Sequence, residues 1–437
     1  MLSLLLTLAL FLFWTGVGRA LLAVFAGRLG VLRSWLLSPA LGFATLGLGI
    51  MVFNQAGLPV KSFALTLTLV LGALACLGLL FKRPLIPFKA LLPFVATTLF
   101  SLLWTAWPAL KFNFSWISIV NDDFTNYCLA AERFKDFGFY RLPLTAEIIG
   151  KDYAHYYWFM HVIGLMRFGA EHMLALVSSI THRPSLEIFM PTIMAFAMAQ
   201  LFSIAGLVLH SGKRRKVALW TALLLSFSPM FLFGSLYQLI AQVSGLSLLF
   251  CLVSLLTAQF RTRSRLTLLN YAVPTAIVGA AQCIFYPEVS PFAVMAVGLY
   301  YLFRFFKDRI IPGAHVVLLQ YSIIGILFIL RHNFISYLYT LANQFEGSAR
   351  KVDLSLSVFP FFLIPSGLSS IFGFQAMNQD MADPWGSVII ILGFILLVIC
   401  ILYVAKAVFR GTPFAFLFIV ELAMAIQMYR TGNDFGL

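Results

Sequence analysis

Long apolar runs constrain the fold of this chain more than any other feature of its sequence. A helix needs about 20 apolar residues to cross the hydrocarbon core of a bilayer, and runs of that length recur along the whole chain. They predict twelve membrane spans, near residues 2–25, 35–54, 62–81, 88–108, 186–209, 217–236, 238–258, 267–286, 289–306, 313–331, 387–405 and 412–428. The first run lacks the basic leader and small-residue cleavage site of a signal peptide, so we expect it to be retained.

Composition excludes an ordinary soluble domain. Of 437 residues, 61% are hydrophobic and only 11% are charged, against about 25% charged in soluble proteins. The net charge of +14 would favour nucleic acid, but the cations lie in short clusters between apolar runs, a distribution that indicates membrane topology. Four of the five cysteines lie inside apolar runs, so no disulfide framework is expected. We therefore expect membrane lipid as a partner and no nucleic acid.

The cation clusters also predict orientation, because basic residues are retained in short cytoplasmic loops. Every second connection between the predicted spans carries them: Arg28 and Arg33; Lys82, Arg83 and Lys89; Lys213 to Lys216; Arg261, Arg263 and Arg265; Arg304, Lys307 and Arg309; Lys406 and Arg410. Both termini should then lie outside the cytoplasm. The expected location is a plasma membrane, the inner membrane of a bacterium, with the active face outside.

This topology divides the chain into five regions. They are four N-terminal spans (1–108), an outer-face loop with amphipathic helices (109–185), spans five to ten (186–331), a second outer-face loop (332–386), and the last two spans with a short tail (387–437). The stretch from Tyr153 to His182 is apolar enough for a further span. That crossing would move the later cation clusters outside and bury an Arg or Glu at about 2.5 to 3.5 kcal/mol. We therefore predict interfacial helices there, and an all-α integral membrane protein overall.

The sharpest polar feature is Asn121-Asp122-Asp123, soon after the fourth predicted span and directly before a helix-like stretch. Asp123 could be a helix N-cap, with Asn126 at the third helical position. That role accounts for one aspartate and leaves the other unexplained. Adjacent carboxylates repel, which raises the proton affinity of one of them. The pair therefore predicts a candidate general base beside the membrane surface.

The segment NDDFTNYCLAAERFKDFGF places an outer-face Asp before an aromatic residue and an Ala-rich helix that ends in Gly. It resembles the first outer loop of the GT-C glycosyltransferases, polytopic membrane enzymes that use lipid-phosphate sugars. The following RFGAEHMLALVSSITHRPSLEIFMP is similar to the second interfacial helix of that family, and the likeness covers residues 115–210. It implies inverting sugar transfer from a polyprenyl-phosphate donor, with Asp122 or Asp123 as the base. Family members commonly place this loop after the first span, whereas here three more spans precede it.

A departing phosphate needs positive donors at the outer interface. The candidates are Arg141, Lys151, His155, Arg167, His172, Arg183, Arg331 and His332. Each of these residues is also compatible with a purely structural or solvated role. Arg167 and Glu171, for example, are spaced to form an ion pair along a helix. Tyr286 and Glu288, in the turn between the eighth and ninth spans, are candidates for contact with a substrate head group, although Pro287 also suits a plain turn.

No cofactor is required by these residues, and the sequence leaves a divalent metal open. Potential ligands are Glu147, Asp152, His155 and His161, but they lack a diagnostic spacing. We expect no obligatory protein-bound metal. The acceptor could be a glycan, a lipid or a protein.

Two other functions stay open. A transporter or flippase is suggested by Glu421 inside the last span, but the paired interrupted spans of repeated transporters are not evident. A non-catalytic membrane assembly subunit would require the Asp pair to have only a capping role.

Overall fold

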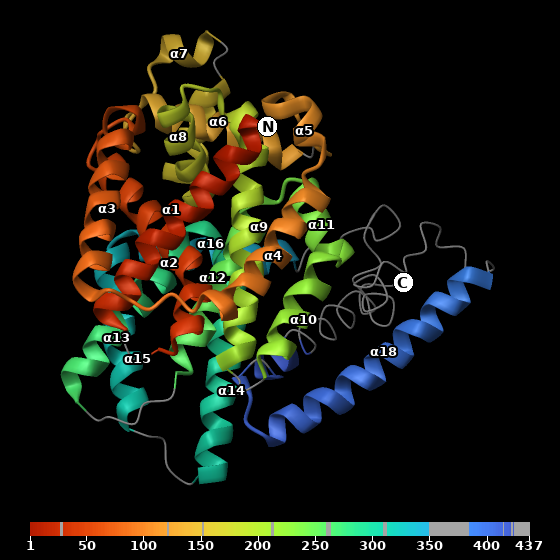
Figure 1. Cartoon of the computed structure of the whole chain (residues 1–437). Helices are drawn as coiled ribbons and strands as arrows, with labels where there is room; N and C mark the ends of the chain where they lie inside the picture. The colour runs from red at the N-terminus through yellow and green to blue at the C-terminus, as the bar shows by residue number, and fades with distance from the viewer. Residues whose placement is uncertain are drawn as a thin grey trace.

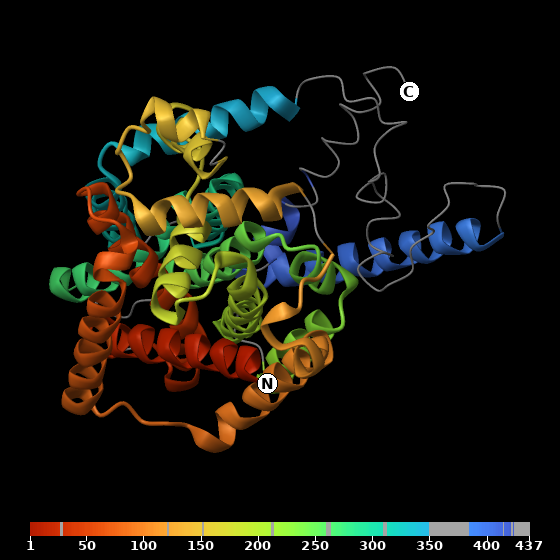
Figure 2. The same cartoon turned by 90° about the horizontal axis from the view of Figure 1, so that it is seen from above.

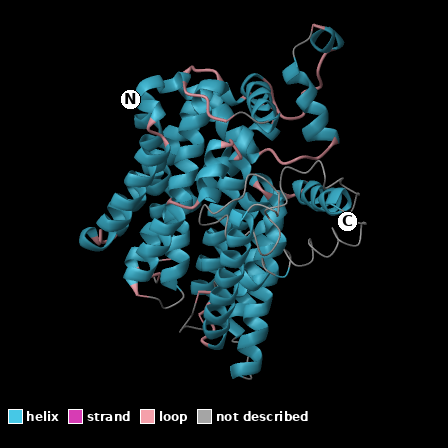
Figure 3. Ribbon diagram, turned by 90° about the vertical axis from the view of Figure 1, so that its right-hand side faces the viewer, coloured by secondary structure: helices cyan, strands magenta, loops and turns pink. Residues whose placement is uncertain are grey.

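The computed structural model describes residues 1–26, 29–119, 122–150, 153–210, 214–258, 264–308, 313–348, 384–413, 415–420 and 423. Every element within these ranges is helical, and they contain no strand (Figure 3). Eight of the described helices are long and apolar enough to cross a membrane. The prediction of an all-α protein of the membrane type is therefore confirmed, whereas the number of twelve spans stays a prediction.

Short helices gather at one end of the bundle, which we call the loop face (Figure 1). These are α5 (Pro108–Phe112), α6 (Asp122–Asp136), α7 (Thr145–Ile149) and α8 (Gly169–Thr181). The first four long helices alternate in direction relative to this end: α1 (Leu2–Phe25), α2 (Val31–Gln55), α3 (Val60–Lys82) and α4 (Phe88–Thr105). The amino terminus bonds to the Ala109 carbonyl at 3.4 Å, and the Asn54 amide donates to the Phe137 carbonyl at 3.0 Å. The start of α1 and the end of α2 therefore both lie at the loop face.

The described helices between α8 and α18 form a second group. It comprises α9 (Ser185–His210), α10 (Arg215–Ser226), α11 (Pro229–Leu236), α12 (Ile240–Leu256), α13 (Arg265–Phe285), α14 (Ser290–Asp308), α15 (Gly313–Leu330) and α16 (Asn333–Ser348). Backbone bonds from Ile119 to Leu236 and from Phe168 to Ile284 bring the ends of α11 and α13 to the loop face. The predicted span 217–236 is in fact two helices, because Pro229 lacks the N–H that would continue α10.

Cations of the predicted cytoplasmic clusters lie at the end opposite the loop face. Arg33 donates to the Ser254 carbonyl at 2.5 Å, and Arg215 donates to the Lys89 carbonyl at 3.0 Å. These bonds tie the start of α2 to the end of α12, and the start of α10 to the start of α4. The clustering of cations at one end is what the positive-inside rule requires, while the side of the membrane that this end faces stays a prediction.

Helices α1 and α2 pack with their backbones in close contact. A Cβ at Gly18 would lie 1.9 Å from the Ser38 carbonyl oxygen, and one at Gly42 would lie 1.8 Å from the Trp14 carbonyl oxygen. Small residues at a crossing allow this approach, which is a common device in membrane helices. Beside the crossing, the Trp14 ring stacks on Phe196 with 4.8 Å between centroids. The core is therefore built around α1, α2 and α9.

Helix α8 differs from the predicted interfacial helix. It has 13 residues, fewer than the roughly 20 that a span needs. Its side chains from Gly169 to Ser179 are buried all along the helix, because α2, α3, α6 and α9 surround it. An interfacial helix would leave a polar face in water, so α8 is better described as a short helix enclosed by protein.

The second predicted loop is described only at its start. Helix α16 follows α15 after a short turn, and the Thr340 hydroxyl bonds to the Leu165 carbonyl at 2.6 Å, so the two loops meet (Figure 2). The later part of this loop, 349–383, lies outside the described residues. The predicted span 387–405 lies within α18 (Pro384–Phe409), which extends away from the main bundle in Figures 1 and 2. Most of the last predicted span, with Glu421, lies outside the described residues.

Candidate functional site

Helix α6 begins at Asp122, so Asp123 occupies its first turn. The predicted capping role of Asp123 is therefore wrong, because a cap precedes the first helical residue. The position before the helix belongs to Asn121, which lies outside the described residues, as does the side chain of Asp122. Asn126, expected to support the cap, instead accepts a hydrogen bond from the Tyr157 hydroxyl. Carboxylates in the first turn are stabilised by the helix dipole, and Asp123 is exposed.

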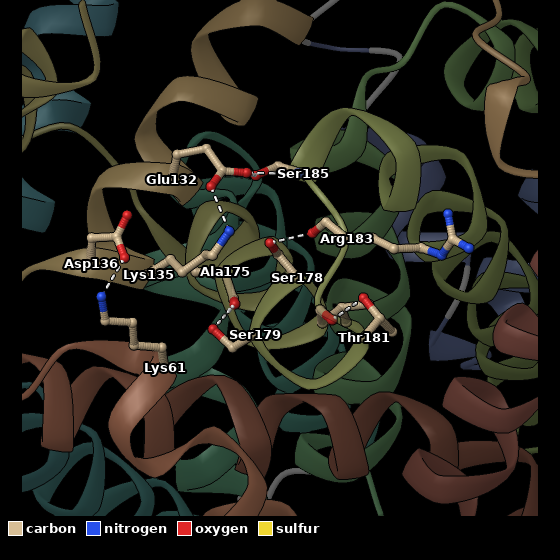
Figure 4. Close-up of polar contacts among 11 residues, drawn as sticks. Lys61, Glu132, Lys135, Asp136, Ala175, Ser178, Ser179, Thr181, Arg183 and Ser185 are labelled. Carbon is tan, nitrogen blue, oxygen red and sulfur yellow. Dashed lines mark hydrogen bonds and ion pairs between the residues drawn. The ribbon is translucent and has the colours of Figure 1, made fainter. Parts of the chain in front are cut away.

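The far end of α6 is held by charged contacts that Figure 4 shows. Glu132 accepts hydrogen bonds from the backbone N–H of Ser185, at 2.7 Å, and from its hydroxyl. It also pairs with Lys135 at 2.8 Å, and Asp136 pairs with Lys61 at 2.8 Å. Although burial opposes it, these hydrogen bonds lower the pKa of Glu132. The carboxylate thus joins α6 to the first turn of α9, where an anion is favoured.

A set of polar side chains from α6, the segment before α8, α8 itself and the turn before α14 lies beside Asp123. We call it the tyrosine–carboxylate cluster: Asp123, Tyr127, Tyr157, Arg167, Glu171, Tyr286 and Glu288. Its members come from distant parts of the sequence, so only the fold brings them together.

Arg167 is the centre of this cluster. Its guanidinium forms an ion pair with Glu288, donates to the Tyr127 hydroxyl at 3.0 Å, and lies 5.6 Å from the Tyr286 ring centroid. The expected helical pair with Glu171 is therefore not the main contact of Arg167. Burial alone would lower the pKa of Arg167, but Tyr127, Glu288 and Glu171 raise it. The guanidinium is a fixed positive charge, and it is already neutralised by Glu288.

Glu171 forms the buried edge of the cluster. Only 6% of this residue is exposed, and one carboxylate oxygen lies 3.8 Å from Nε2 of His161. The Nδ1 of His161 lies 2.8 Å from the Tyr157 carbonyl, which can only accept, so Nδ1 carries the proton. Nε2 therefore faces the carboxylate with a lone pair unless a second proton is present.

Asp123 acts electrostatically on all three phenols of the cluster. Burial raises the pKa of Tyr127 to about 12, with the charges of Glu171 and Asp123 adding to the effect and Arg167 opposing it. Burial also raises the pKa of Tyr157, helped by Glu171 and Asp123. The pKa of Tyr286 is raised by burial, then by Glu288, with a smaller part from Asp123. The phenols stay protonated and can donate hydrogen bonds.

Most of the predicted phosphate-binding cations lie elsewhere and have partners. Arg141 pairs with Glu147 at 2.8 Å, and Arg183 pairs with Glu187 at 2.6 Å. His155 is buried against the Phe137 ring. Lys151 lies outside the described residues. Of the predicted residues, the structure therefore brings Arg167, Tyr286 and Glu288 to Asp123, but not Arg141 or Arg183.

His172 is a core residue of α8. It is fully buried, Nε2 lies 3.1 Å from the Asn54 side-chain oxygen, and the ring packs 4.4 Å from that of Phe134. Burial, with His161 and Arg133 adding to it, lowers its pKa well below the usual value. A neutral imidazole enclosed by aromatic rings is a poor phosphate ligand, so this contact favours a structural role for His172.

Arg331 and His332 lie together at the turn between α15 and α16. Both are exposed, and His332 is hydrogen-bonded to the Tyr140 hydroxyl. Arg331 has no hydrogen bond or ion pair from its side chain within the described ranges. Of the predicted cations that the structure describes, Arg331 is thus the most available to an anion.

The described residues contain no group of three or more side chains that could hold a metal ion. Among the ligands considered from sequence, Glu147 is paired with Arg141, and His161 faces Glu171 alone. Asp152 lies outside the described residues.

Sequence reasoning missed Tyr127, Tyr157 and the role of His161. Tyr127 follows Asp123 by four positions, and His161 follows Tyr157 by four, so each pair shares a helical face. That spacing was the available signal. The contact of Arg167 with Glu288 had none, because the two residues are 121 positions apart.

A small hollow, with a volume of about 10 Å³, lies among α4, α9 and α11. Its wall is mainly apolar: Ser101, Leu102, Thr105, Met194, Ala197, Met198, Leu201 and Phe231. The Thr105 hydroxyl is buried and has no partner among the described residues. The backbone bond from Ile119 to Leu236, at 3.0 Å, connects α11 to the segment that leads into α6. The hollow is thus lined in part by α11, the helix that this backbone bond joins to the segment before α6.

Fold and site together define an all-helical protein of the membrane type with a buried polar cluster at its loop face. No protein-family model, curated protein or solved structure matches this chain.

Proposed function

We propose that the chain is a membrane glycosyltransferase of the GT-C type, which transfers a sugar from a polyprenyl-phosphate donor to an acceptor at the loop face. One observation carries the proposal: Asp123 presents an exposed carboxylate in the first turn of α6, one helical turn from Tyr127, whose hydroxyl accepts a hydrogen bond from Arg167. The bundle of long apolar helices supports a lipid-linked substrate. The loop face would then lie outside the cytoplasm, at the inner membrane of a bacterial cell.

The chemistry needs one base. Asp123 or its neighbour Asp122 takes the proton from an acceptor hydroxyl, whose oxygen forms the new bond to the anomeric carbon. The bond between that carbon and the donor phosphate oxygen breaks on the opposite side, and the phosphate leaves with the electron pair. A phosphate is a good leaving group, so no second carboxylate is required as the acid, in contrast to a glycosidase.

The phosphate of the donor has a complementary charge at the loop face. Arg331 is an exposed cation at the loop face, suited to the phosphate, and the exposed His332 lies next to it in the chain.

The test is transfer from a polyprenyl-phosphate sugar by the full-length chain in liposomes. Asp122→Asn and Asp123→Asn remove one charge each while preserving size, and a base removed in this way costs about 10² to 10⁴-fold in rate. Glu187→Gln is the matched control, because Glu187 pairs with Arg183 away from the cluster. We expect one Asp variant to lose transfer with its fold intact. Full activity in both, together with loss of function in Glu421→Gln, would favour the transporter instead.

A further inference from the structure

The tyrosine–carboxylate cluster carries an excess of negative charge. Among the described residues its carboxylates are Asp123, Glu171 and Glu288, and its cation is Arg167. The two carboxylates of the cluster that are not exposed, Glu171 and Glu288, therefore face one fixed cation, which is paired with Glu288. Buried charges are normally paired, so the cluster is short of positive charge.

The same residues include three buried polar atoms without a hydrogen-bond partner among the described residues: the Nε donor of Arg167 and one carboxylate oxygen each of Glu171 and Glu288. Only 6% of Glu171 is exposed. Its charge acts on Tyr127 and Tyr157 in the same cluster. An unmade hydrogen bond at a buried charged group is costly. Each of the two carboxylate oxygens can accept a further hydrogen bond from an N–H donor.

The aromatic rings of the cluster suit a cation. Tyr127, Tyr157 and Tyr286 stand around the carboxylates, and Arg167 already lies 5.6 Å from the Tyr286 centroid. A ring face attracts a positive charge within about 6 Å of its centroid. Tyrosine rings combined with carboxylates are the usual surroundings of an organic ammonium group.

A metal ion fits this arrangement less well. The carboxylates come from α6, α8 and the turn before α14, and no group of three or more potential ligands is formed by the described side chains. Metal ligands must approach within about 2 to 2.6 Å of one point. An ammonium group, with three donors directed apart, can instead bridge carboxylates that are farther from one another.

We propose that the cluster binds a primary ammonium group carried by the substrate, as in an amino sugar or an aminoalkyl-bearing acceptor. The ammonium would lie between Glu171 and Glu288 against the tyrosine rings, and a neighbouring hydroxyl would be presented to Asp123. Binding of the ammonium group does not depend on the reaction. That the amine belongs to a substrate rests on the proposed glycosyl transfer.

The first experiment compares charged and uncharged probes on the purified full-length chain in detergent. Thermal unfolding is followed with D-glucosamine, N-acetyl-D-glucosamine, ethanolamine and ethylene glycol over a range of concentrations. A ligand that binds only the folded state raises the melting temperature with concentration. We expect both amines to raise it and both neutral probes to have no effect. Equal effects of charged and neutral probes, or stabilisation by Mg²⁺ or Mn²⁺ without any by the amines, overturn the proposal.

The second experiment locates the site. In Glu171→Gln or Glu288→Gln, amine binding should weaken about tenfold to a hundredfold, the loss expected for one hydrogen bond to a charged group. Glu187→Gln should bind as the wild type does. Two separate variants guard against one of them failing to fold, and unchanged binding in both refutes the assignment. The comparison of probes on the wild-type chain stands in either case.

Transfer assays separate the two sources of the amine and the two proposals. A donor whose sugar bears a free amine, tested against its N-acetyl form, reports on the donor; an aminoalkyl acceptor tested against its hydroxyl counterpart reports on the acceptor. Amine binding without any transfer would refute the proposed glycosyltransferase and support the ammonium site. Transfer that is sensitive to Asp123→Asn, without amine binding, would refute the ammonium site and support the glycosyltransferase.

Discussion

Replacing Gly18 with alanine should separate α1 from α2. The new Cβ would lie 1.9 Å from the Ser38 carbonyl oxygen, where an ordinary contact is 3.4 to 4 Å. Both partners are backbone, so no side chain can rotate to make room. If α1 and α2 move apart by about 0.5 to 1 Å to relieve the clash, each dispersion contact between them loses about a quarter to a half of its energy. Overpacking a core costs about 1 to 3 kcal/mol or more. We expect a loss at the upper end of that range.

The same helix offers a matched control. A Cβ at Gly16 meets nothing within 4 Å, so Gly16→Ala makes the same chemical change on the same helix without the clash. Thermal unfolding can be followed by the reaction of buried Cys251 with a fluorescent maleimide, because the exposed thiols react equally in all variants. Gly16→Ala should unfold near the wild-type temperature and Gly18→Ala well below it. Equal melting temperatures would refute the close crossing of α1 and α2.

Three further predictions follow from other contacts. Glu132→Gln should lower the free energy of unfolding by about 1 to 3 kcal/mol. Because the fold lowers the pKa of Glu132, the wild type should lose this contribution as the pH falls from about 4.3 through the lower pKa of the folded state. Urea unfolding measured at several pH values should show this loss in the wild type and not in the variant. Asn54→Leu should destabilise the chain by about 1 to 3 kcal/mol, since the Leu58 and Phe137 carbonyls lose their donor; an unchanged melting temperature would contradict this. A cysteine at Ala146 should react with an impermeant maleimide in intact cells and one at Lys216 should not, and labelling at Lys216 would reverse the proposed orientation.

The long helices could be predicted because their cause is local. A run of apolar residues sets the length of a helix, and the cations at its ends set its direction, so both are visible in the sequence. The break before Pro229 also had a local signal, which the length of the apolar run outweighed. Helix α8 was harder, because its composition resembles that of an interfacial helix and only its neighbours show that protein covers it on all sides.

The site was predictable only in part, for the same reason. Two adjacent aspartates stand out without any structure, but the choice among many cations depends on tertiary contacts. Arg141 has an acid six positions away that neutralises it, whereas Arg167 finds its partner across the fold. A list of loop cations therefore overestimates the charge available to a phosphate, because pairing removes several of them.

The anchoring of α6 explains how an exposed carboxylate can be precisely placed on a loop. Its carboxyl-terminal half is fixed by Glu132 and Asp136, which bind α9 and α3. Its amino-terminal half is held differently, through Tyr127 to Arg167 and through Asn126 to Tyr157. Sites gain precision when their supporting side chains are themselves fixed. The position of Asp123 therefore depends on the cluster that would bind the ammonium group, so ligand binding there and orientation of the base are expected to be coupled.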